Sequence, residues 1–162
     1  MNLIGLKVGA LAGLPCIAPT PPLIHADAET AKAELLALHQ ADRRAHFHHD
    51  VDALVASLPS EFIYVRDGKI QRQTKEDLRK RFVQYFQGAE FSAWDDLEPP
   101  IIHASPDGQM GWMVVRVKIA YSKTDAAGKK SQEQSVIAWM SVYEKQEGKW
   151  LHVADASTFE PE

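Results

Sequence analysis

The fold is decided by one long stretch, residues 109–121, which reads QMGWMVVRVKIAY. Successive side chains of a β-strand point to opposite faces of a sheet, and β-branched residues favour strands. The stretch therefore predicts a strand whose first face carries Met113, Val115, Val117, Ile119 and Tyr121. Its second face carries Trp112, Val114, Arg116 and Lys118, and that face is open to water, covered by a partner or lining a cavity.

The chain on both sides of this stretch alternates short apolar runs with turn residues. A Ser-Pro-Asp-Gly turn precedes the long strand at 105–108, and Glu147-Gly148 turns the chain near its end. The pattern predicts four further strands at residues 91–97, 101–104, 135–143 and 150–159. The second half of the chain is thus a predicted antiparallel meander.

The first half of the chain carries helical signals. Apolar residues recur three and four apart over residues 27–58, with a break at 46–50 where Asp50 can cap a second, shorter helix. Asp67-Gly68 predicts a hairpin between runs at 62–65 and 70 onward. Thr74 and Asp77 form a box-like start for a further helix, which Gly88 ends. The predicted fold class is α+β, with a curved antiparallel sheet wrapped around N-terminal helices.

Length and charge limit the function classes. The 162 residues suit one domain, and 18 basic against 22 acidic residues give a net charge of −4. The densest basic run is Arg79-Lys80-Arg81, whereas a nucleic-acid binder usually shows a concentrated basic face. We therefore predict no nucleic-acid partner.

Residues 1–26 differ from the rest of the chain. An apolar stretch containing Lys7 is followed by a proline-rich run and Ala26, which favours an export signal over the alternative of a disordered cytoplasmic tail. The apolar run is too short to span a bilayer. We expect a leader at 1–26, a periplasmic or secreted location, and a domain at 27–162. Cleavage after Ala26 would also remove the one cysteine, Cys16.

The element order, together with Ala45…Asp50, the Asp67-Gly68 hairpin and residues 147–153, resembles the nuclear transport factor 2-like superfamily. This superfamily includes SnoaL-like proteins and ketosteroid isomerases, and the resemblance covers about residues 33–159. It implies a cystatin-like cone whose helices and sheet enclose a pocket. The superfamily contains enzymes, ligand binders and dimerisation modules, so the fold does not decide the function. By ungapped transfer, the isomerases' catalytic Tyr falls on Asp42 and their catalytic Asp on Arg66. Neither catalytic role therefore transfers to this sequence.

Candidate catalytic residues lie in a histidine-rich part of the first helix. His39, Asp42, His46 and His49 step by three, four and three residues along one side. A metal site there would lack a sharp motif, so we predict no metal and no cofactor. A buried Asp42 would need a partner, for which Arg66 and Arg116 are candidates, because an unpaired buried carboxylate is costly. An outward Asp42 would be an ordinary surface acid.

The strands supply the remaining candidates. In Trp94-Asp95-Asp96, alternation places Phe91, Ala93 and Asp95 on one face and Ser92, Trp94 and Asp96 on the other. One of the two acids is expected to be solvated. The four tryptophans can line a cone, fill the core or form a dimer face. The candidate ligand contacts are Asp42, Arg66, Trp94, His103, Arg116, Trp139 and Asp155, and the catalytic candidates are Asp42, His46 and His152.

These residues leave three functions open. The predicted function is binding of a small apolar ligand in the cone, combined with homodimerisation through a sheet face containing Trp112 and Arg116. The alternative is a cofactor-independent isomerase or dehydratase that uses Asp42 with His46 or His152.

Overall fold

The computed structural model describes residues 24–160, which form three helices and seven strands. In chain order they are α1 (Ile24–His48), α2 (Val51–Ala56), β1 (Glu61–Arg66), β2 (Lys69–Thr74), α3 (Lys75–Phe86), β3 (Ala89–Asp96), β4 (Ile101–Ala104), β5 (Met110–Thr124), β6 (Lys130–Gln146) and β7 (Lys149–Phe159).

The helix boundaries follow the capping residues that the sequence indicated. The Asp50 carboxylate accepts a hydrogen bond from the Ala53 N–H and thereby begins α2. Thr74 and Asp77 form a full capping box at the start of α3. The break between α1 and α2 consists of His49, with φ of 53°, and the capping residue Asp50. It turns α2 away from the axis of α1.

The seven strands form one sheet with the order β2-β1-β7-β6-β5-β3, and β4 also pairs with β5. All neighbours are antiparallel except β1 and β7, which pair in parallel with Ile63 opposite Ala154. The sheet is therefore mixed, which corrects the expectation of a wholly antiparallel sheet. Pairing β1 with the last strand folds the first hairpin back onto the end of the chain. The helices then lie between the two ends of the sheet.

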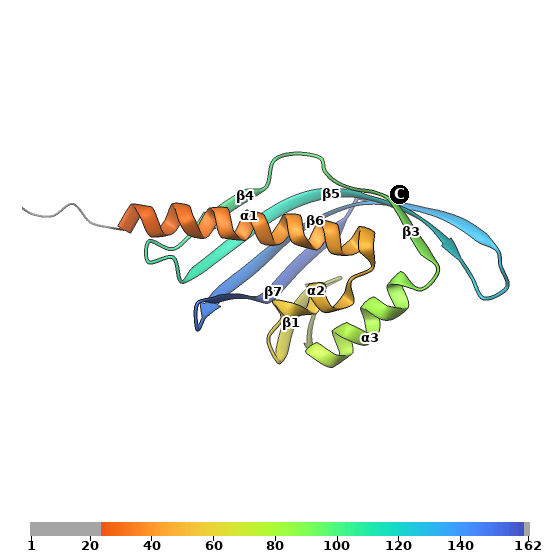
Figure 1. Ribbon diagram of the computed structural model, residues 1–162, viewed down its shortest axis with the longest axis horizontal. Coiled ribbons are helices and arrows are strands. Elements are labelled where there is room, and N and C mark those ends of the chain that lie inside the picture. The colour runs from red at the N-terminus through yellow and green to blue at the C-terminus, as the bar shows by residue number, and fades with distance from the viewer. Residues whose placement is uncertain (1–23, 161–162) are drawn as a thin grey trace, which may run out of the picture.

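The three helices cover one face of the curved sheet (Figure 1). α1 crosses β4 and β5 and packs tightly there, where Leu35 is fully buried against a core that includes Met113 and Val117. α2 and α3 lie over the other side of the same face, next to β1. Two smaller clusters, around Val55 and around Phe86, fill that region. The sheet and the two short helices thus enclose the space described below.

A bulge in β3 changes which of its side chains point toward the helices. The pairing of β3 with β5 shifts register between Phe91 and Ala93, which leaves Ser92 as the extra residue. Phe91 and Trp94 both contact the His46 ring, at 5.8 and 5.0 Å between ring centroids. The expectation that strict alternation would place Phe91 and Trp94 on opposite faces is therefore wrong.

The predicted leader at 1–26 lies almost entirely outside the described residues, and α1 begins at Ile24, inside its last three positions. Within residues 24–160 no helix is both long enough and apolar enough to cross a membrane.

Candidate functional site

A cavity of about 230 Å³ lies between the helices and the inner face of the sheet. We call it the first chamber. Seventeen residues from eight elements and the segment after α2 line it, and most of them are apolar: Asp42, His46, Leu54, Ser57, Leu58, Phe62, Tyr64, Leu78, Arg81, Phe82, Trp94, Ile119, Ile137, Trp139, His152, Asp155 and Ser157. An apolar pocket with a few convergent polar groups is the usual form of a small-molecule site.

Asp42 reaches the first chamber from the C-terminal half of α1. Its carboxylate has no ion pair or hydrogen bond with any of the residues 24–160, and burial raises its pKa to about 7. The expected partners lie elsewhere: Arg66 is 3.3 Å from Asp67, and Arg116 is 3.5 Å from Glu160. Desolvation disfavours the charged form of Asp42. Near neutral pH its carboxyl group can therefore act as a general acid when protonated and as a general base when ionised.

His46 lies one turn after Asp42 and lines the same chamber. Its Nδ1 is 2.8 Å from the backbone carbonyl of Asp42, and because a carbonyl oxygen only accepts, Nδ1 carries the proton. Burial lowers the His46 pKa to about 4. The ring is therefore neutral at pH 7, and its Nε2 lone pair is available as an acceptor.

His152 and Asp155 enter the chamber from β7, on the side opposite α1. The His152 Nε2 and an Asp155 carboxylate oxygen are 4.0 Å apart, which is too long for a hydrogen bond. His152 Nε2 and Asp155 Oδ1 are both buried, and neither has a hydrogen-bond partner among the described residues. Burial lowers the His152 pKa to about 4 and raises the Asp155 pKa to about 7. Buried polar groups nearly always have partners, so this pair is suited to receive a polar ligand atom.

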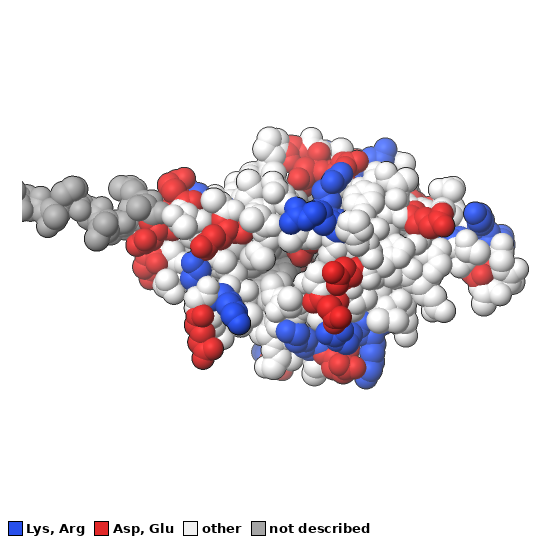
Figure 2. Space-filling model, in the orientation of Figure 1, with Lys and Arg blue, Asp and Glu red and all other residues white. Residues whose placement is uncertain are grey.

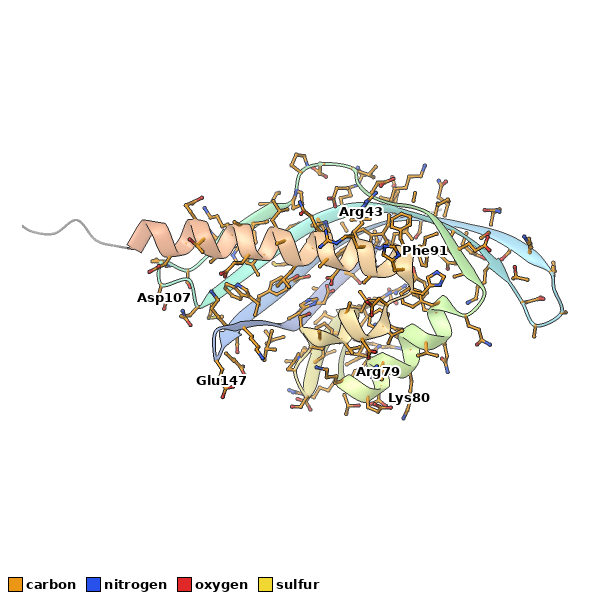
Figure 3. The ribbon with its side chains drawn as sticks, viewed as in Figure 1. Arg43, Arg79, Lys80, Phe91, Asp107 and Glu147 are labelled. Carbon is orange, nitrogen blue, oxygen red and sulfur yellow. The ribbon has the colours of Figure 1, made fainter. Side chains whose placement is uncertain are left out.

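The chamber thus brings together six of the predicted ligand contacts or catalytic candidates from distant elements: Asp42, His46, Trp94, Trp139, His152 and Asp155. Trp94 and Trp139 meet edge to face at 5.8 Å between ring centroids and form an aromatic wall. Arg43 lies on α1, the helix next to that wall (Figure 3). The Arg43 Nε donates to the Trp94 carbonyl and so ties α1 to β3.

His103 and Arg116 were predicted as ligand contacts, but the structure places both on the outer face of the sheet. Strand register sets His103 opposite Trp112, and the two rings stack at 5.4 Å. Arg116 alternates with the buried residues Val115 and Val117 and is exposed. The prediction that these two residues contact a ligand in the cone is therefore wrong, because their faces follow from alternation along β4 and β5.

The histidine-rich helix does not gather into one cluster. His39 is buried at 3% exposure, and its Nε2 lies 2.7 Å from the Asp96 carboxylate of β3. Asp95 is solvated and meets Arg43 at 2.7 Å. Among residues 24–160 no three His, Cys, Asp or Glu side chains are close enough to hold a metal ion. His39 and Asp96 form a structural pair that the sequence analysis did not foresee.

Four polar chamber residues were not proposed as site residues by the sequence analysis, namely Ser57, Tyr64, Arg81 and Ser157. The Tyr64 hydroxyl lies 2.7 Å from the Ser157 hydroxyl, across the parallel β1–β7 pair. Arg81 belongs to the basic run that was interpreted only as a charge feature. Its position one turn after the buried Leu78 on α3 was the available signal.

Comparison with known proteins now places the fold. No family model and no curated protein matches the sequence. Solved structures do match. A nuclear transport factor 2-like protein from Cytophaga hutchinsonii is 16% identical with a TM-score of 0.62, over 79% of this chain and 97% of that one.

The fold is nuclear transport factor 2-like. A ketosteroid isomerase-like protein from Erwinia carotovora atroseptica is 14% identical with a TM-score of 0.61, over 81% of this chain and 97% of that one. A putative calcium/calmodulin-dependent protein kinase II association domain from Xanthomonas campestris is 19% identical with a TM-score of 0.56, over 80% and 87%. The nuclear transport factor 2-like cone expected from the element order is therefore confirmed, and at these identities the similarity concerns the fold alone.

Proposed function

We propose that this protein binds a small, largely apolar molecule in the first chamber. The observation that carries the proposal is the pair of buried atoms, His152 Nε2 and Asp155 Oδ1, which lack partners and line an apolar cavity. An unpaired buried polar group costs free energy, and a ligand that supplies its hydrogen bond recovers that cost. Trp94 and Trp139 supply the apolar contact for the body of the ligand.

A thermal-shift screen with a filled-cavity control tests this proposal. Ser57→Phe places a ring in the chamber, whereas Ser60→Phe makes the same substitution at an exposed position three residues away. We expect library compounds that raise the melting temperature of the wild type and of Ser60→Phe, and leave Ser57→Phe unchanged. Equal shifts in all three proteins, or no shift with any compound, would contradict binding in the chamber.

The second candidate function is catalysis by Asp42 with a chamber histidine. Asp42, whose pKa is raised to about 7, can exchange a proton near neutral pH, and the neutral ring of His46 lies on the same wall of the chamber as a hydrogen-bond partner for a substrate. Such an enzyme would move a proton on a bound substrate without a cofactor, in an isomerisation or dehydration. Once a substrate is found, Asp42→Asn should abolish its turnover while the variant still binds it. Undiminished turnover would remove Asp42 from the reaction.

We also propose a homodimer through the outer face of the sheet. Ile101, Trp112, Met140 and Val65 are exposed there, and the strand pairing joins them into one apolar band across β4, β5, β6, β7 and β1. Exposed apolar patches of this kind mark interaction sites. The matching Xanthomonas structure is described as an association domain, which agrees with such a role.

Sedimentation tests the dimer. The wild type should sediment as a dimer at micromolar concentration, and Met140→Glu should convert it to a monomer, because the new charge would be buried at the interface. Val83→Glu introduces the same charge at an exposed apolar position on α3 and should leave the dimer intact. A wild-type monomer would disprove the proposed interface.

A further inference from the structure

A second chamber of about 400 Å³ adjoins the first. The two share six wall residues, His46, Tyr64, Arg81, Phe82, Ile119 and Ile137, so they form one elongated space. Outside this shared wall the chambers differ in chemistry. The first has the carboxyl groups of Asp42 and Asp155, whereas the second has Arg66 and the hydroxyls of Tyr85, Tyr121 and Ser135.

The second chamber is suited to an anion. Its wall contains two guanidinium groups, from Arg66 and Arg81, and none of its lining residues is an aspartate or glutamate. Elsewhere on the helical face, basic side chains lie among acidic ones (Figure 2). Guanidinium and hydroxyl groups donate hydrogen bonds to carboxylates, and the planar guanidinium fork matches the geometry of a carboxylate.

Neither guanidinium donates a hydrogen bond to an acid among the described residues, although the charge of Arg81 opposes the effect of burial on the pKa of Asp155. The Arg66 Nε is buried without a hydrogen bond, 3.3 Å from an Asp67 carboxylate that is largely exposed to water. Its guanidinium lies 4.0 Å from the centre of the Phe159 ring. Arg81 donates at 3.1 Å to the amide oxygen of Gln73, which carries no charge. Both side chains are therefore held in place and retain donors for a ligand.

From this we infer that the two chambers together bind an elongated amphipathic acid. Its anionic group lies between Arg66 and Arg81 in the second chamber, and its apolar body extends past the shared wall toward Trp94 and Trp139. The reverse orientation would place the anion beside the carboxyl groups of Asp42 and Asp155 and away from Arg66, and ionisation of either carboxyl group disfavours it. This inference rests on the proposed function, because it requires that the first chamber accept an apolar body.

A matched pair of probes separates the two proposals. 2-Naphthylacetate and 2-naphthylacetamide have nearly the same shape and differ in charge, and calorimetry measures the affinity of each. We expect the acid to bind the wild type about tenfold more tightly than the amide, as a charged hydrogen-bond pair contributes. Arg66→Met and Arg81→Met should each weaken binding of the acid more than binding of the amide and so remove most of this preference. Arg66→Lys and Arg81→Lys should retain part of it.

Arg116→Met is the control, since Arg116 lies on the outer face of the same sheet and should leave the preference intact. Melting curves of each variant identify any loss of folding, and the lysine variants then decide the result. Equal affinity for acid and amide, or a preference that no substitution at Arg66 or Arg81 reduces, would overturn the anionic subsite and leave small-molecule binding standing. If neither probe binds, both proposals fail.

Discussion

Two buried histidines, His39 and His152, have opposite surroundings. His39, on the tightly packed side under α1, is 2.7 Å from Asp96, and its ring is near those of Trp94 and Trp139. His152, on the side under α2 and α3, leaves its Nε2 without a hydrogen-bond partner beside a cavity. The same side chain is structural where it is paired and available to a ligand where it is not. The region under α1 therefore stabilises the fold, whereas the region under α2 and α3 contains the candidate ligand site.

The largest expected difference concerns apolar packing in these two halves. Leu35→Ala should lower the free energy of unfolding by about 4 kcal/mol, because Leu35 is fully enclosed. Leu58→Ala should cost about 2 kcal/mol, since Leu58 already borders the first chamber and makes fewer contacts there. Urea denaturation of both variants measures the two losses. Equal losses would mean that the two halves are equally well packed.

A second comparison exchanges the histidines themselves. His39→Leu should destabilise by about 2 kcal/mol, because it removes the charge-assisted contact to Asp96. His152→Leu should change stability by less than about 1 kcal/mol, since it replaces an unpaired polar atom by apolar volume. The same denaturation experiment provides both values. A larger loss at His152 than at His39 would reverse the assignment of structural and ligand-binding roles.

The pH dependence of stability sharpens the account of the first chamber. Asp42 and Asp155 have folded pKa values raised from 3.8 to about 7, so they reduce stability as the pH rises through this window. His46 and His152 have folded pKa values lowered from 6.5 to about 4, so they increase stability as the pH rises from 4 to 6.5. In the wild type these opposing slopes largely cancel.

Replacing both aspartates by asparagine should expose the histidine contribution alone. The free energy of unfolding of this double variant should rise between pH 4 and 6.5, by roughly 1–2 kcal/mol per pH unit. Denaturation at a series of pH values measures the slope. A double variant with the same pH profile as the wild type would show that the four groups are not desolvated.

The smallest effect is expected at the surface pair between the two regions. Arg43→Met removes the 2.7 Å contact to the exposed Asp95 together with a bond to the Trp94 carbonyl. Exposed ion pairs contribute little, so the loss should be below about 1 kcal/mol. A thermal melt suffices as the measurement. A loss as large as that of His39→Leu would mean that α1 is held by its surface contacts.

The sequence predicted what local chemistry decides. Asp50, the Thr74–Asp77 box and the Asp67-Gly68 turn set three boundaries correctly, and alternation along residues 110–121 identified the strand at the centre of the fold. The parallel pairing of β1 with β7 has no local signal, because it joins segments about ninety residues apart. No local pattern predicted the bulge at Ser92 either. The bulge places Phe91 on the face of β3 opposite to the expected one.

The candidate site likewise contains some residues that the sequence could predict and others that it could not. Asp42 and His46 were found because helical spacing placed them next to the apolar stripe of α1. Arg116 and His103 were misassigned because alternation defines two faces of a strand without saying which one the helices cover. Arg81 was missed because a run of three basic residues resembles a solvated surface, although only one of the three reaches the chambers. Figure 3 shows its neighbours Arg79 and Lys80 at the outer side of α3.

The most direct test is an NMR pH titration of the aspartate side-chain carboxyl carbons in the ligand-free protein. Asp42 and Asp155 should titrate with midpoints near 7, because both carboxyl groups lie in a desolvated chamber. Asp107, at the β4–β5 turn, provides an internal reference, since its hydrogen bond with Ser105 holds its pKa below the ordinary value. Midpoints near 4 for both chamber aspartates would show that water or a charged partner reaches them, and the proposed site would be contradicted.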